Sequence, residues 1–201
     1  MIKRTLFCLI FLVIGCSSKP TPETQYFVLN PDTQATSTAI TKSLENDSKN
    51  IVVIKSIKLA EFLDQPGIVL QTDAHQIEVA HYHRWGEPLT RGLHRYVLET
   101  LTTQLPQHSL LSSNEFSSDL IHQKLDITVN QFHGTTDGSA LLSGHWMLQQ
   151  SDSKTSIVHE PFSYQASLTD SGYPELVNQL ANLLEDLCDD IASSIKASVE
   201  E

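Results

Sequence analysis

PELVNQLANLLEDLCDDIASSIKA, residues 174–197, has the apolar repeat of an amphipathic helix. Apolar side chains recur every three or four residues and share one face, while acidic and amide side chains occupy the other. That apolar face consists of Leu176, Val177, Leu180, Leu183, Leu184, Leu187, Ile191 and Ile195. A helix with a single apolar face must cover another element, so this segment predicts a layered fold.

A second amphipathic helix is predicted from Glu87 to Leu105. Pro88 suits the first turn of a helix, and Pro106 cannot continue one. The apolar positions have helical spacing and are Leu89, Leu93, Tyr96, Val97, Leu101 and Leu105. This helix therefore also presents one apolar face to a partner element.

Short apolar or alternating segments predict β-strands in the rest of the chain. They cover residues 26–29, 51–59, 68–72, 76–80, 125–130, 142–148 and 162–168. Asp73-Ala74-His75 is expected to turn one strand into the next, and residues 134–138 are expected to form a second turn. Residues 30–50 are open to two interpretations, a mobile excursion or a short helix. The order predicts a single α+β domain over residues 26–201, an α/β sandwich in which two helices cover a mixed, largely antiparallel sheet.

The N-terminus has the pattern of a secretion signal. Lys3 and Arg4 precede the apolar run Leu6–Val13, which is far shorter than the ~20 residues needed to cross a bilayer. Val13-Ile14-Gly15-Cys16 is similar to a lipobox, so residues 1–15 are interpreted as a lipoprotein signal peptide and Cys16 as the lipidated residue. An ordinary signal peptide with a chance cysteine is the alternative.

The position after Cys16 favours the outer membrane. Ser17 stands where an aspartate would resemble the bacterial signal for retention in the inner membrane. We therefore expect an outer-membrane lipoprotein on the periplasmic face, held by its acyl chains (palmitate among them). Residues 16–25 contain two prolines and are interpreted as an extended lipidated tether of ~3 Å per residue.

Charge and cysteine content exclude several classes of function. Of 13 Lys and Arg residues, Lys3 and Arg4 leave with the leader, so 11 basic residues face 24 acidic ones, a formal net charge of −13. This balance argues against a nucleic-acid partner, whose phosphates require a basic surface. After lipidation of Cys16 and loss of Cys8, Cys188 remains alone, which excludes an intrachain disulfide and a zinc site built from cysteines. Cys188 lies on the apolar face of the last helix, so buried packing is favoured over a reactive thiol.

Three segments together resemble the ABC-type transport auxiliary lipoprotein family, the PqiC/YmbA lipoproteins. They are Tyr26-Phe27-Val28-Leu29, Phe62-Leu63-Asp64-Gln65-Pro66-Gly67-Ile68-Val69 after a strand, and Arg84-Trp85-Gly86-Glu87-Pro88-Leu89 at the entrance to the first helix. Residues 125–132 followed by Trp146 are a weaker match. Gln65, Gly67 and Gly86 stand where the family usually has Arg, Gln and Ala, so a binding role for that arginine is not carried over.

The resemblance implies a non-catalytic accessory protein without a cofactor. Family members are similar to outer-membrane partners of systems that move lipid across the periplasm and maintain envelope integrity. The implied partner is an inner-membrane protein with MCE domains, for which the lipoprotein would form a homo-oligomeric docking collar. The alternative is an assembly lipoprotein of another envelope machine, such as a secretion pilotin.

The candidate partner-binding residues are Leu63, Asp64, Pro66, Arg84, Trp85 and Glu87. Residues 64–67 have the composition of a turn, in which Pro66 fixes φ and Gly67 can adopt a positive φ. Trp85 is expected to pack over the start of the first helix, with Glu87 near its positive end. Arg84 is expected to pair with Glu87 or to stack on an aromatic ring. The same residues could instead form a cap that only orients the helix.

Metal binding and catalysis are disfavoured by the motifs. His75, His81 and His83 lie close in the sequence, and a strand would point His81 and His83 to the same side. Zinc enzymes need three protein ligands, yet the chain has no HExxH spacing and no G-x-S-x-G nucleophile turn. Scattered histidines are the favoured interpretation, and a periplasmic hydrolase is the least favoured class.

Overall fold

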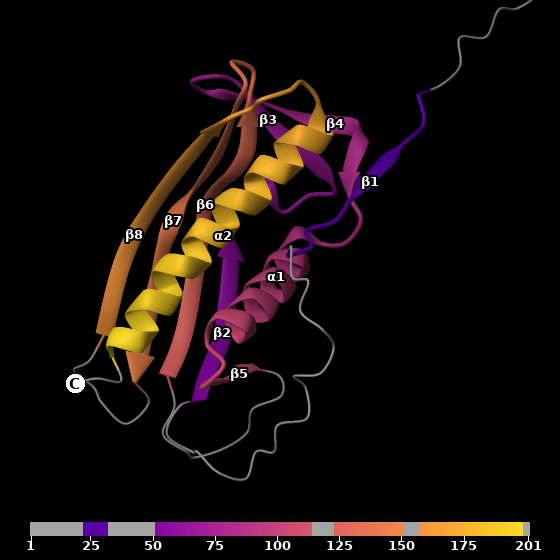
Figure 1. The fold of residues 1–201 in the computed structure, drawn as a ribbon. Helices are drawn as coiled ribbons and strands as arrows, with labels where there is room; N and C mark the ends of the chain where they lie inside the picture. Colours follow the sequence, from indigo (N-terminus) through magenta and orange to yellow (C-terminus); the bar gives the residue numbers. More distant parts are fainter. Residues whose placement is uncertain (1–21, 32–50, 114–122, 151–156, 199–201) are drawn as a thin grey trace, which may run out of the picture.

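Two helices lie on the same side of one eight-stranded sheet in the computed structural model, which describes residues 22–31, 51–113, 123–150 and 157–198 (Figure 1). The predicted signal peptide, Cys16, Ser17, most of the predicted tether and residues 32–50 lie outside the described residues. The helices are α1 (Leu89–Gln104) and α2 (Tyr173–Ala197), and a short 3-10 helix η1 spans Glu61–Leu63. The strands are β1 (Gln25–Phe27), β2 (Ile51–Leu59), β3 (Gly67–Asp73), β4 (Gln76–Trp85), β5 (Ser109–Ser112), β6 (Gln123–Thr135), β7 (Ser139–Gln150) and β8 (Ile157–Ser167).

Strand β6 organises the sheet. It pairs with β7 along one edge, and β7 pairs with β8; both of these long ladders are antiparallel. Its other edge is shared by two parallel partners, β2 along residues 123–129 and β3 at residues 134–135. Beyond them, β5 lies parallel to β2, while β4 is antiparallel to β3 and β1 is parallel to β4. The predicted class, a single α+β domain with a mixed sheet and two helices, is confirmed.

The predicted helices are present with small changes of bounds. Pro88 caps α1 instead of occupying its first turn, because its backbone is extended (φ −52°, ψ 127°), so the helix begins at Leu89 and Glu87 precedes it. Strand β5 was not predicted, since SLLS is short and does not alternate. It forms because it pairs with residues 51–54 of β2, and the spacing of apolar residues within a segment cannot predict such a long-range contact.

A β-bulge explains why β6 is longer than predicted. Leu125, Ile127 and Val129 are buried, as the alternation indicates, but the register shifts between Val129 and Gln131. The next buried apolar residue is therefore Phe132 rather than position 131. Because one extra residue changes which face the following side chains occupy, the two-residue pattern is interrupted at Asn130 while the strand continues.

The core fills the space between the sheet and the helices. All eight apolar-face residues predicted for α2 are buried, and Cys188 and Ala192 join them. Each fully buried leucine or isoleucine contributes about 1.5–3 kcal/mol relative to exposure. The Tyr96 hydroxyl in α1 donates to the Ala181 carbonyl in α2 at 3.0 Å, which ties the two helices together. The apolar faces of both helices are thus used in covering the sheet.

Cys188 is expected to be inert in the folded protein. Its side chain is 0% exposed, and burial raises the pKa of its thiol, so little thiolate is present at neutral pH. We expect DTNB to modify Cys188 at least ~1,000-fold more slowly in buffer than in denaturing urea, because reaction requires unfolding. Absorbance of the released thiolate measures both rates, with Cys188→Ser as the blank. Rapid modification of the native protein would contradict this packing.

Candidate functional site

Three segments that lie far apart in the sequence meet at one corner of the sheet, where β1, β4 and the start of β3 come together (Figure 1). The Trp85 N–H donates to the Pro66 carbonyl at 2.7 Å, and the Gly86 N–H donates to the Phe27 carbonyl at 2.7 Å. The pairing of β1 with β4 aligns Tyr26 with Arg84. The corner therefore assembles the same segments that carry the family resemblance.

Glycine is required at position 67 because β3 approaches β4 closely there, and not because of its φ angle. Among the described residues only Gly138 and Gly172 have a positive φ, so the expected positive φ at Gly67 is wrong. A Cβ at position 67 would lie 2.5 Å from the Ala80 carbonyl oxygen and 2.5 Å from the Val79 side chain. Glycine thus lets β3 begin directly against β4.

Two of the candidate residues support the corner from inside. Leu63 is 1% exposed and Trp85 is 7% exposed. The Trp85 ring lies 6.0 Å from the Phe132 ring, centroid to centroid, within the core. Neither side chain is presented to a partner, so both act by fixing the backbone that carries their exposed neighbours.

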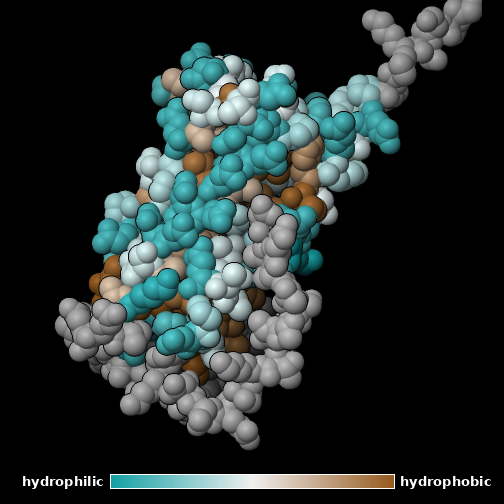
Figure 2. Space-filling view, in the orientation of Figure 1, coloured by the Kyte–Doolittle hydropathy of each residue, from teal (hydrophilic) through white to brown (hydrophobic). Residues whose placement is uncertain are grey.

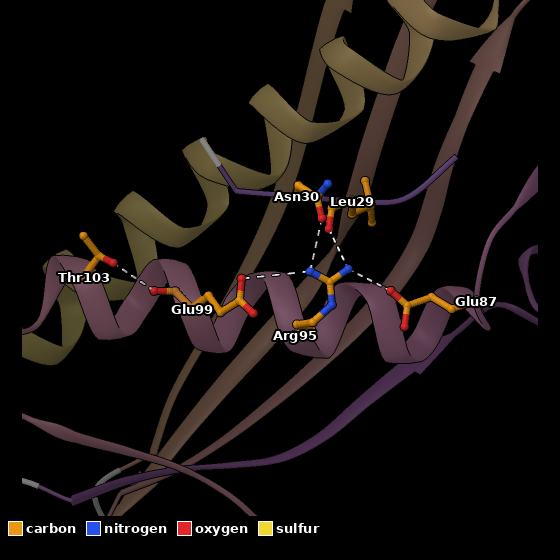
Figure 3. A network of polar contacts seen from close by, with 6 residues as sticks. All are labelled: Leu29, Asn30, Glu87, Arg95, Glu99 and Thr103. Atoms are coloured by element: carbon orange, nitrogen blue, oxygen red, sulfur yellow. Dashed lines mark hydrogen bonds and ion pairs between the residues drawn. The ribbon is translucent and has the colours of Figure 1, made fainter. Parts of the chain in front are cut away.

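Glu87 is held by Arg95 rather than by Arg84 (Figure 3). The Arg95 guanidinium donates to the Glu87 carboxylate at 2.8 Å and to the Leu29 carbonyl at 2.8 Å. Longer contacts reach the Asn30 amide oxygen at 3.4 Å and the Glu99 carboxylate at 3.9 Å. The fork of donors on Arg95 suits several acceptors at once. This network fastens the segment after β1 to helix α1.

Arg84 faces the other way, which is why the expected pair with Glu87 does not form. It precedes Trp85 in a strand, so its side chain leaves the sheet on the face opposite the core. Among the described residues it has neither an ion pair nor an aromatic contact. Arg84 is half-exposed, while Asp64 and Pro66 are exposed nearby.

Exposed aromatic and apolar side chains surround Arg84. Tyr26 is 66% exposed beside it on β1, and Tyr82, two residues earlier on β4, is 39% exposed. Val28, just after β1, is 48% exposed. We call Tyr26, Val28, Tyr82, Arg84, Asp64 and Pro66 the corner surface. Tyrosine and arginine are enriched at the energetic centres of protein interfaces.

The sequence did not indicate Tyr26, Val28 or Tyr82 as partner-binding residues, although Tyr26 and Val28 belong to one of the motif segments. A run such as Tyr-Phe-Val-Leu predicts a buried strand, but Tyr26 and Val28 are exposed, whereas Phe27 and Leu29 between them pack on the core. The sequence could have indicated that Tyr82 lies beside Arg84, because residues i and i+2 of a strand share a face.

Of the three nearby histidines, His83 is held by packing, whereas His75 and His81 are exposed. His83 stacks on Tyr173 of α2, with ring centroids 3.9 Å apart, and lies 6.2 Å from Phe27. Across the described ranges, no group of three His, Cys, Asp or Glu side chains is placed to hold a metal ion. Neither α1 nor α2 is long and apolar enough to cross a membrane.

Comparisons with known proteins match most of this chain to one family of lipoproteins. The family model described as the ABC-type transport auxiliary lipoprotein component matches residues 27–192. The chain is 28% identical over 141 residues to the intermembrane transport lipoprotein PqiC of Escherichia coli K12, covering 70% of this chain and 72% of that protein. PqiC of Shigella flexneri matches to the same extent.

Solved structures show the same fold. The crystal structure of an uncharacterized protein superposes with a TM-score of 0.71 at 23% identity, covering 87% of this chain and 99% of that one. A protein from Xanthomonas campestris superposes with a TM-score of 0.62 at 16% identity, covering 75% and 86% of the two chains. The likeness extends over most of the sheet-and-helix architecture.

Proposed function

Because the chain belongs to the family of ABC-type transport auxiliary lipoprotein components, we propose that it is the non-catalytic docking subunit of an MCE-type intermembrane lipid transport complex. Its Cys16 lipid holds it on the periplasmic face of the outer membrane. There it receives an inner-membrane protein with MCE domains and supports envelope integrity. PqiC, the curated relative, is an intermembrane transport lipoprotein.

The corner surface is the observation that supports docking. It presents two tyrosines, a valine and an arginine on backbone that Trp85 and the Arg95 network hold in place. A surface that is rigid before binding loses less conformational entropy when a partner docks. The corner also begins about ten residues after Cys16, so the partner would meet it within roughly 30 Å of the membrane.

A lipid path through one domain is disfavoured by the core. The apolar faces of α1 and α2 pack on the sheet and on each other, leaving those side chains buried. Opening a pocket for acyl chains would remove that burial, at about 25 cal/mol per Å² of apolar surface. We therefore assign the lipid path to the assembled complex, with several copies of this lipoprotein forming a collar around the MCE protein.

Capture of the partner tests this function. The mature lipoprotein in detergent should retain the periplasmic part of its cognate MCE-domain protein, and Tyr26→Ala with Arg84→Ala should weaken binding at least ~30-fold, the effect of losing about 2 kcal/mol at an interface centre. Arg91→Ala, on the exposed side of α1, should bind as the wild type does. Surface plasmon resonance measures all three.

Two results would contradict the proposal. Failure to retain every cognate MCE protein would remove the docking function. Retention of a secretin subunit instead would favour the pilotin class. Equal affinity of the double variant and the wild type would leave docking intact but would exclude the corner surface as its site.

A further inference from the structure

Two histidines on neighbouring strands lie against each other on the side of the sheet that faces away from the helices. His145 of β7 and His159 of β8 have ring centroids 5.1 Å apart and an interplanar angle of 82°. Neither imidazole has a hydrogen-bond partner among the described residues. Their ring nitrogens are therefore available to a ligand from solvent.

Met147 places a thioether beside both imidazoles. It lies two residues after His145 on β7, so the two side chains share a face, and it is the direct partner of His159 in the ladder between β7 and β8. Residues directly opposite each other in an antiparallel pair have Cβ atoms about 4.5–5.5 Å apart. We call His145, Met147 and His159 the His-Met cluster.

The His-Met cluster faces solvent and not the core. Trp146 and Leu148, which alternate with it along β7, are buried. Both helices lie on the other side of the sheet, the side seen in Figure 2, where hydrophilic side chains run along α2. His159 is exposed, while His145 and Met147 are half-buried. An ion can therefore reach all three side chains, and the His159 ring can turn toward it without disturbing the core.

The separation of the two rings fits a shared metal ion. An imidazole nitrogen binds a first-row metal ion at about 2.0 Å, which places the centre of the ring ~3.2 Å from the metal. Two imidazoles at a tetrahedral angle around one ion then have ring centres ~5.2 Å apart. The observed distance of 5.1 Å is close to this value. Binding would thus require rotation of the rings and no movement of the strands.

We propose that the His-Met cluster binds one Cu⁺ ion. A thioether sulfur is a soft ligand that suits Cu⁺, and imidazole suits copper as well. Zn²⁺ is instead bound in proteins by thiolate, imidazole and carboxylate groups. Because its third ligand is a thioether, the His-Met cluster is distinct from the sets of His, Cys, Asp and Glu considered above. It shares no residue with the corner surface and does not depend on the docking function.

The nearby charges also favour a singly charged ion. Asp126, opposite Met147 on β6, already pairs with Lys55 at 3.3 Å. Lys58 and Lys124 lie on the same face and have no carboxylate partner in the described part of the chain. Their repulsion is weaker for a singly charged ion than for a divalent one, and the three ligands of the cluster are neutral groups.

The methyl group of Met147 gives a direct test on the wild-type protein. The chain has two methionines, Met1 and Met147, so the mature lipoprotein labelled with ¹³C-methyl methionine should give one methionine signal in detergent. One equivalent of Cu⁺, kept reduced by ascorbate under argon, should shift this signal and the ring-proton signals of His145 and His159. Zn²⁺ should leave the methionine signal in place. A methionine signal that Cu⁺ does not move would overturn the site.

Variants test each ligand through the affinity for Cu⁺, measured by competition with bathocuproine disulfonate on protein without a polyhistidine tag. Met147→Leu, His145→Asn and His159→Asn should each weaken binding at least ~10-fold, the loss typical even of residues that only orient a metal ligand. His75→Ala with His81→Ala removes two exposed imidazoles elsewhere and should bind Cu⁺ as the wild type does.

Cys188→Ala is the control for the other sulfur ligand. Its thiol is buried, so this variant should also bind Cu⁺ with the affinity of the wild type. A loss of affinity in either control as large as that of Met147→Leu would place the ion elsewhere and overturn the proposal, and so would a Met147→Leu variant that binds as the wild type does. Unchanged melting temperatures by circular dichroism show that the variants fold.

Discussion

Gly144→Ala is expected to destabilise the domain by about 3 kcal/mol, the upper end of the usual cost of overpacking. Gly144 lies in the middle of β7, between Val129 of β6 and Phe162 of β8. A Cβ there would lie 2.0 Å from the Thr128 carbonyl oxygen and 2.8 Å from the Phe162 ring. Because the nearer atom belongs to the backbone, the β6–β7 ladder itself would have to shift.

Gly92→Ala is the matched control for this substitution. Gly92 lies inside α1, and a Cβ there would meet its neighbours at 3.6 Å or more, which is ordinary van der Waals contact. Alanine is favoured over glycine in a helix by up to ~1 kcal/mol, so the same chemical change should leave stability unchanged or raise it.

Urea unfolding followed by circular dichroism measures both variants. The midpoint should fall for Gly144→Ala at an unchanged slope, since the unfolded surface area is the same. A loss of about 3 kcal/mol is a large share of the ~5–15 kcal/mol typical of a domain. Equal midpoints for the two alanine variants would show that the strands pass each other with more room than the structure gives them.

Cys16→Ala is expected to remove the protein from the outer membrane almost completely. Lipidation buries acyl chains at ~0.8 kcal/mol per CH₂, and two chains are needed for stable anchoring. Without them, no described helix can cross the bilayer, and the apolar run Leu6–Val13 is too short to do so. The alanine variant should be released or left unprocessed, as membrane fractionation and immunoblotting will show.

Ser17→Asp is the control for the anchor, because it leaves Cys16 in place. It should stay membrane-bound but move to the inner-membrane fraction. Mass spectrometry of the wild-type N-terminus should find an acylated residue at position 16. An unmodified N-terminus, or an alanine variant that still fractionates with the outer membrane, would contradict both the anchor and the location derived from it.

Local repeats in the sequence predicted most elements correctly. The apolar spacing of α2 identified every residue of its buried face except Ala192, since Cys188 was expected to be buried from its place on the same face. The hairpin between β3 and β4 and the turn before β7 were predicted from short polar segments. These features succeed because side chains three, four or two residues apart share a face whatever the rest of the chain does.

The candidate site was predicted as segments but not as a surface. The sequence indicated that residues 62–69 and 84–89 belong together, yet it could not show that Trp85 points into the core while Arg84 points out. It offered Arg84 as a partner for Glu87 or for an aromatic ring, whereas the partner of Glu87 is Arg95, eight residues further along the chain and nearly two turns into α1. The contacts of Arg84 and Glu87 depend on how β4 and α1 are oriented in space, which the local sequence does not specify.

The amino-acid sequence by itself determined most of the element types, the two covering helices, the buried position of Cys188 and the acidic character of the protein. Tertiary structure alone decided that β2 and β3 share one edge of β6, that three motif segments meet at one corner, and that Arg95 rather than Arg84 pairs with Glu87. The physical reason is the separation along the chain of the residues that interact. Periodicity acts between near neighbours in the chain, whereas strand order and surface charge arise from residues that only folding brings together.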